Sequence, residues 1–190
     1  MRIVLFWALL MHGDGHKTEL TIDNMPERPT WVHPVIPIHG RRAIQEGEWS
    51  EPPEILLCHN GPVTISRIER AIRYWTRLGY TFGTVRQALP GNTACLTNEA
   101  SAGTITIDIP SQEFRFGTHL GSTKAWRYTA NNEIFKARIE IIPAWGTSER
   151  ILEHEIGHAL GWKDMNSTGH IMHSVWAAGG YNSAGVRNEK

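Results

Sequence analysis

The sequence predicts an α+β domain, and three observations lead to that fold class. Five short segments have the apolar or alternating patterns of β-strands: residues 55–58, 80–85, 104–109, 124–128 and 134–142. Two further segments are predicted to be helical, one over residues 65–78 and one that ends at Gly161. The chain after Gly161 is rich in glycine, asparagine and serine, which indicates loops.

The first 23 residues have two interpretations. One positive charge followed by nine apolar residues (3–11) resembles a short signal peptide, but no small-residue cleavage site follows. Asp14-Gly15 is a tight-turn dipeptide and residues 19–23 alternate between polar and apolar, so residues 2–23 also fit a β-hairpin. We favour the hairpin.

The next segment, residues 24–53, is expected to be an extended arm. It contains six of the ten prolines of the chain and shows little periodicity. We therefore divide the chain into an N-terminal extension, residues 1–53, and a compact domain, residues 54–190. The extension is a candidate for contact with a protein partner.

The compact domain is expected to begin with a strand at residues 55–58, followed by an amphipathic helix. Apolar side chains recur at helical spacing over residues 65–78. Ser66 and Glu69 fit a capping box at the start of this helix, and Gly79 is expected to end it.

The second half of the domain supplies the remaining strands and a second helix. Residues 134–142 alternate and are followed by Pro143, which indicates a strand near a sheet edge. Thr147 or Ser148 is suited to cap the helix that follows.

That helix carries the most informative motif, His-Glu-Ile-Gly-His-Ala-Leu-Gly-Trp-Lys-Asp at residues 154–164. Positions i and i+4 share a helix face, so His154 and His158 can direct two imidazoles at one metal ion. Glu155 is placed to take a proton from a water molecule on that metal. Gly161 can end the helix in a left-handed conformation and turn the chain back, which presents Asp164 as a third ligand.

Other residues near the motif have competing interpretations. His170 and His173 are rival third ligands, although loop residues beside the site are the favoured assignment. Tyr181 is either a group that stabilises an oxyanion or, as we favour, a plain loop tyrosine. Three tryptophans could line a cleft or simply be buried: Trp145, Trp162 and Trp176.

The motif resembles that of the metzincin zinc peptidases, and within them the matrixin-like group. The similarity includes the active-site helix and a following Gly169-His-Ile-Met172, which is similar to the Met-turn of the family. Residues 68–82 resemble the first helix of the family, so the likeness covers about residues 54–176. It implies a twisted mixed sheet packed on two long helices, with Met172 beneath a zinc ion and residues 134–142 as the edge strand that binds an extended substrate.

The motif departs from most metzincins at Asp164, where histidine is usual. A bacterial subgroup, the snapalysin-like peptidases, has aspartate there. Because carboxylate oxygen is an ordinary zinc ligand, two histidines and one aspartate make a chemically reasonable catalytic set.

We therefore expect a zinc-dependent endopeptidase that acts on protein or peptide substrates, with Zn²⁺ held by His154, His158 and Asp164 and with Glu155 as general base. The alternative is a structural subunit of a larger particle, such as a phage or secretion-type assembly, with a structural or locally used zinc site. Hydrolysis of peptidoglycan or of a small amide by the same chemistry is a third interpretation.

Composition excludes several other classes of protein. Lys and Arg total 19, as do Asp and Glu, so the net charge of zero argues against a nucleic-acid binder. No apolar run reaches the roughly 20 residues of a transmembrane helix, so we expect no integral membrane protein. The location that we expect is secreted or particle-associated. Cys58 and Cys95 allow at most one disulfide, and we expect Cys58 to be a small core residue of its strand.

Overall fold

The computed structural model describes residues 42–59, 61–97, 100–110 and 119–188. All of them belong to one compact unit, residues 38–190, in a chain that divides into two units. The hairpin expected at residues 2–23 and most of the proline-rich arm lie outside the described residues. The described part is an α+β domain, as the sequence predicts.

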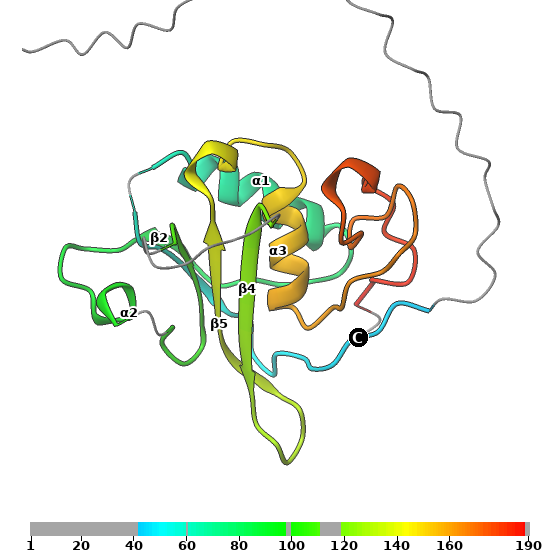
Figure 1. Cartoon of the computed structure of the whole chain (residues 1–190). Coiled ribbons are helices and arrows are strands. Elements are labelled where there is room, and N and C mark those ends of the chain that lie inside the picture. The colour runs from blue at the N-terminus through cyan, green and yellow to red at the C-terminus, as the bar shows by residue number, and fades with distance from the viewer. Residues whose placement is uncertain (1–41, 60, 98–99, 111–118, 189–190) are drawn as a thin grey trace, which may run out of the picture. The chain divides into compact units, whose positions relative to one another are not determined.

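A five-stranded mixed sheet forms the centre of this domain (Figure 1). Its strands are β1 (Glu54–Leu57), β2 (Val85–Gln87), β3 (Thr104–Asp108), β4 (Gly121–Arg127) and β5 (Ile134–Ile141). The order across the sheet is β2-β1-β3-β5-β4. The first three neighbouring pairs are parallel, whereas β4 and β5 are antiparallel.

The strand at the β4 end of the sheet differs from the expectation for residues 134–142. Residues 134–142 correspond to β5, which pairs with β3 on one side and β4 on the other. It therefore lies near the edge, as Pro143 indicates, but it is not itself the edge strand that the resemblance to metzincins implies. Pro143 lies just beyond β5, at the start of the short 3-10 helix η2 (Pro143–Trp145), and therefore interrupts no pairing. In the described part of the chain, β4 pairs only with β5 and forms the edge.

Strand β2 is also displaced from its predicted position. The sequence predicts a strand at residues 80–85, but β2 covers only Val85–Gln87. Tyr80 instead packs into the core, where its hydroxyl accepts a hydrogen bond from Trp162 Nε1 at 2.8 Å. This tertiary contact overrides the local strand pattern.

Two helices pack on one face of the sheet, α1 (Ile65–Thr76) and α3 (Ile151–Ala159). They have 12 and nine residues, so the expectation of two long helices is wrong. Thr64, rather than Ser66, caps α1, because its hydroxyl accepts a hydrogen bond from Arg67 N at 3.2 Å. No helix in the described ranges is long and apolar enough to span a membrane.

The core lies between these helices and the sheet. Trp75 of α1 and Leu152 and Ile156 of α3 are buried against strand side chains such as Ile107 and Ile139. A buried ion pair joins the two helices beside this core: Arg67 Nη1 donates to Glu153 Oε1 at 2.8 Å, and both side chains are only 4% exposed. The ion pair fixes the packing of α3 against α1.

The last residues of the expected extension pack against the end of α3. Glu46 N donates to Gly161 O at 2.9 Å, and Trp49 Nε1 donates to Ala159 O at 2.8 Å. The bond to Ala159 O satisfies a carbonyl group that the helix leaves unpaired at its C-terminus, and the bond to Gly161 O holds the turn that follows it. Residues 43–50 therefore brace the helix that carries the histidine motif.

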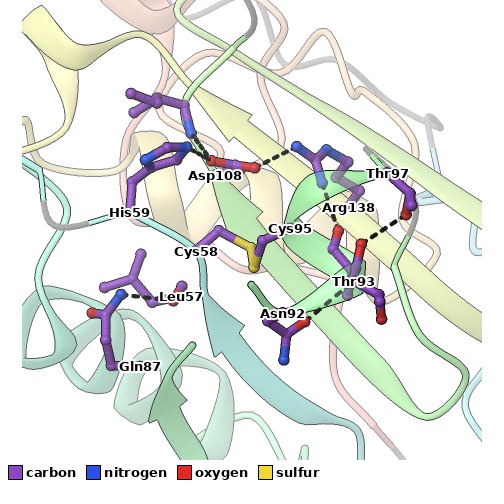
Figure 2. The surroundings of a disulfide bond; sticks show 12 residues. Leu57, Cys58, His59, Gln87, Asn92, Thr93, Cys95, Thr97, Asp108 and Arg138 are labelled. Carbon is purple, nitrogen blue, oxygen red and sulfur yellow. Dashed lines mark hydrogen bonds and ion pairs between the residues drawn. A yellow bond between two sulfur atoms is a disulfide. The ribbon is translucent and has the colours of Figure 1, made fainter. Parts of the chain in front are cut away.

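The short helix α2 (Thr93–Leu96) lies beside β3 and accepts a hydrogen bond from Arg138 of β5 through Ala94 O. A disulfide between Cys58 and Cys95 ties it to the end of β1 (Figure 2). Cys58 is half-buried and bonded to Cys95, so the expectation that it is a small core residue is wrong, while the disulfide that the two cysteines allow is present. Beside the disulfide, the buried Asp108 carboxylate pairs with Arg138 and with His59 Nε2, the latter at 2.9 Å (Figure 2).

Candidate metal centre

Three side chains of the predicted site meet at one point. His154 and His158 lie one turn apart on α3 with their Nε2 atoms 3.1 Å from each other. Asp164 Oδ1 lies 3.5 Å from His154 Nε2 and 3.4 Å from His158 Nε2. Their donor atoms all lie within 4.8 Å of one another, so this cluster could hold a metal ion.

Backbone carbonyl groups fix the orientation of both imidazoles. His154 Nδ1 lies 2.9 Å from Ile171 O, and His158 Nδ1 lies 2.7 Å from Trp162 O. Because a carbonyl oxygen only accepts, each Nδ1 carries the hydrogen, and in the neutral ring each Nε2 presents a lone pair. Two lone pairs facing each other at 3.1 Å need a proton or a cation between or beside them.

The turn that brings in Asp164 depends on glycine. Gly161 follows the C-cap residue Leu160 and has a φ of 95°, a left-handed conformation that L side chains rarely adopt. A Cβ atom there would also collide with Gly47 O. The chain then reverses, and Asp164 arrives beside the histidines with its side chain half exposed.

The start of α3 differs from the sequence expectation. Neither Thr147 nor Ser148 caps the helix; the N-cap is Arg150, which makes no side-chain capping bond. Ser148 is instead part of the preceding turn, where its N–H donates to Trp145 O at 3.0 Å and its carbonyl accepts from Arg67.

Met172 lies fully buried under α3. A Cβ atom at Gly157 would lie too close to Met172 Sδ for any side chain to fit. This contact explains why glycine occupies the position before His158. Met172 N also donates to His170 Nδ1 at 3.0 Å. Since His170 is fully buried and its Nε2 lies 3.1 Å from Ala184 O, both of its ring nitrogens are occupied and neither is available to a metal.

Glu155 is held from across the cleft by strand β4. Thr123 Oγ1 donates to Glu155 Oε2 at 2.6 Å. Gly121 lies against the other oxygen, because a Cβ atom there would be 2.8 Å from Glu155 Oε1. Burial raises the pKa of Glu155, while the charge of His158 and the hydrogen bond from Thr123 act in the opposite direction.

The two imidazoles differ in basicity. Burial lowers the pKa of His154 to about 4, which keeps this ring neutral near pH 7. Burial also disfavours the charged form of His158, but the hydrogen bond with Asp164 and the charge of Glu155 outweigh it and raise that pKa. A neutral imidazole is the form that ligates metals.

These residues line a cleft of about 960 Å³ between β4, α3 and the loop that follows it. Trp162 and Trp176 line this cleft, whereas Trp145 packs against Trp176 at 6.0 Å between ring centroids. His173 lines it as well, and its Nδ1 accepts from Val175 N at 3.0 Å. Tyr181 is 48% exposed and its ring packs against Tyr74, in agreement with a loop tyrosine.

Several residues of the cleft were not identified from the sequence. Gly121 and Thr123 come from β4, and His119 and Arg150 also line the cleft. Thr123 lies 32 residues before Glu155 and belongs to no motif, so only the pairing of the strand with the sheet brings it to the site.

No protein-family model and no curated protein matches the chain in sequence comparisons. The assignment of a function therefore rests on the chemistry of this cleft.

Proposed function

We propose that this protein is a zinc-dependent endopeptidase of the metzincin type. The observation that carries the proposal is the convergence of His154, His158 and Asp164 beside the buried carboxylate of Glu155, in a cleft bordered by an edge strand. Two imidazoles and a carboxylate next to an acid–base residue are a recurrent composition of catalytic zinc sites.

The separations within the cluster support zinc. In a tetrahedral site with zinc–ligand bonds of about 2.05 Å, two ligand atoms are roughly 3.3 Å apart. The three separations here are 3.1, 3.4 and 3.5 Å. The carbonyl groups of Ile171 and Trp162 supply the outer hydrogen bonds that orient histidine ligands.

The composition of the cluster favours a catalytic role over a structural one. Structural zinc sites use four protein ligands, whereas catalytic sites use three and leave one position for water or substrate. Among the described residues only three ligands converge. His170, an alternative ligand considered from the sequence, has both ring nitrogens in contact with the backbone of Met172 and Ala184.

Zinc bound there would polarise the scissile carbonyl group and acidify a water molecule. Glu155 takes the proton of that water and returns it to the leaving amine, a task that its raised pKa suits. Thr123 donates a hydrogen bond to Glu155 Oε2, so Oε1 is the oxygen available for proton transfer.

An extended peptide is the substrate that the cleft fits best. Strand β4 borders the cleft and pairs only with β5 among the described strands, so a peptide can add to its free side. The disulfide suits an oxidising, extracellular environment, which we propose as the place of action.

The test combines metal analysis with hydrolysis. The purified full chain is expected to contain about one zinc per molecule and to cleave unstructured proteins, such as reduced casein. Glu155→Gln should keep the zinc and lose hydrolysis by at least about a thousandfold. A Glu155→Gln variant that hydrolyses casein at the wild-type rate, or a wild-type protein that never binds zinc, contradicts the proposal.

A further inference from the structure

The residue that immediately precedes α3, Arg150, has an unusual backbone conformation. Its φ is 70°, a left-handed value that costs free energy in any residue with a Cβ atom. Glycine or asparagine would relax this position, and an N-cap usually supplies a side-chain hydrogen bond, which Arg150 does not. Strained positions of this kind cluster at functional sites.

The strained backbone directs the guanidinium group into the cleft. Arg150 lines the same cleft as His154, Glu155 and His158. Its Cζ lies 4.8 Å from the ring centroid of Trp176, and its Nη1 donates to Trp176 O at 3.1 Å. A side chain at Gly179 would crowd this group, because an added Cβ would lie 3.2 Å from Arg150 Nη1.

The aromatic side of this arrangement is itself anchored. Trp176 belongs to the short helix η3 (Trp176–Ala178), and its Nε1 donates to Glu149 O at 3.1 Å. The ring is 38% exposed, so it presents a partly open face beside the guanidinium. The stacking holds the arginine fork in place at little further cost in side-chain entropy.

Within the described ranges, Arg150 differs from the other cations of the cleft in having no acidic partner. Arg127 and Lys163 both pair with Glu46, the former at 3.3 Å. Arg150 makes no ion pair with any of the described residues, and only one of its five N–H donors is used. A half-buried guanidinium with free donors is a site for a carboxylate, which it can bind in a bidentate manner.

We propose that Arg150 recognises a carboxylate group of the substrate, a specificity that rests on the endopeptidase function proposed above. Arg150 lies one helical turn before His154, about 6 Å along the helix axis, and each residue of an extended peptide spans about 3.3 Å. The carboxylate therefore belongs to an Asp or Glu side chain within about three residues of the scissile bond, or to the C-terminus of a peptide cut near its end.

The experiment compares matched peptides on the zinc-loaded full-length protein. One series places Glu or Gln at each position within three residues of the cleaved bond. A second series ends in a free carboxylate or in an amide. We expect kcat/KM to favour one carboxylate peptide over its neutral counterpart by about tenfold, the magnitude of one charge-assisted hydrogen bond. The series that shows the preference identifies the source of the carboxylate.

Variants assign that preference to Arg150. Arg150→Gln should abolish it, and Arg150→Glu should reverse it in favour of the neutral member of each pair, with the zinc content unchanged. Arg127→Gln is the matched control, since Arg127 lines the same cleft but already pairs with Glu46, and it should keep the preference. If Arg150→Glu fails to fold, Arg150→Gln alone carries the comparison.

Measurements of peptide binding test the role of Arg150 independently of the proposed endopeptidase activity. The dissociation constants of fluorescein-labelled acid and amide peptides are measured on the Glu155→Gln variant, with no need for turnover. Equal affinities and equal kcat/KM for both members of every pair overturn the role of Arg150. A carboxylate preference in binding without hydrolysis by the wild-type protein supports Arg150 and rejects the endopeptidase.

Discussion

Thr123 on the edge strand donates a 2.6 Å hydrogen bond to the carboxylate of Glu155 on α3, joining the sheet to the residue that we propose as the general base. The same hydroxyl also lies 3.1 Å from Glu155 O, so it contacts both the side chain and the backbone of that residue. This contact leaves only one oxygen of Glu155 free.

Thr123→Val, which removes the hydroxyl at constant shape, is expected to lower kcat about tenfold with little change in KM, because Glu155 loses its fixed orientation. The hydrogen bond lowers the pKa of Glu155, so its loss raises that pKa and moves the acidic limb of the kcat/KM profile to higher pH. Thr123→Ser keeps the hydroxyl and should restore both. A valine variant with the wild-type pH profile contradicts this role.

Gly121→Ala should inactivate the protein without unfolding it. The new Cβ would stand 2.8 Å from Glu155 Oε1 and displace the oxygen that we propose takes up the proton. Gly61→Ala is the control, because nothing lies within 4 Å of a Cβ atom at that glycine. Thermal melting and peptide hydrolysis are measured on both variants; full activity in Gly121→Ala argues that Glu155 uses another path.

Asp164→Ala is expected to weaken zinc binding more than about a hundredfold, since even the loss of an outer-shell partner costs ten- to a hundredfold. His173→Ala tests the remaining rival ligand, and its zinc affinity should change little, because His173 stands outside the converging group. Competition with a fluorescent chelator measures both. If His173→Ala lowers the zinc affinity more than Asp164→Ala does, then His173 rather than Asp164 is the third ligand.

The ion pair between Arg67 and Glu153 predicts a strong effect on stability. Glu153→Gln leaves the buried guanidinium without a counter-charge and should lower the free energy of unfolding by about 3–5 kcal/mol. The double replacement Arg67→Met/Glu153→Leu should recover a large part of that loss, because no buried charge remains. Urea denaturation of the three proteins checks this, and equal stability of the single and double variants counts against it.

The disulfide should contribute to stability without supplying a group to the site. It closes a loop with a sequence separation of 37, for which loop-closure entropy gives about 4 kcal/mol as an upper value. Cys58→Ser/Cys95→Ser is therefore expected to melt at a lower temperature and to keep its zinc. Loss of zinc in the folded double variant would show that the loop with α2 also supports the site.

The sequence predicts correctly those features that depend on residues close together in the chain. A helix period of 3.6 residues places His154 and His158 on one face whatever the surroundings, and Gly161 adopts the left-handed turn expected of it. The positions of β3 and α1 were likewise evident from their periodicity. The cap of α1 was misplaced by two residues, because Thr64 and Ser66 are chemically equivalent candidates.

Features that depend on pairing between distant segments were decided by the tertiary structure. An alternating pattern does not reveal which strands lie on either side, so the sequence does not distinguish β5, the edge strand that the resemblance implies, from β4, the strand that forms the edge of the described sheet. The sequence determined the donor set His154, His158 and Asp164 with Glu155. Only the fold placed Thr123 and Gly121 against Glu155 and directed Arg150 into the cleft, because these contacts arise when strand pairing and helix packing bring together residues that share no local pattern.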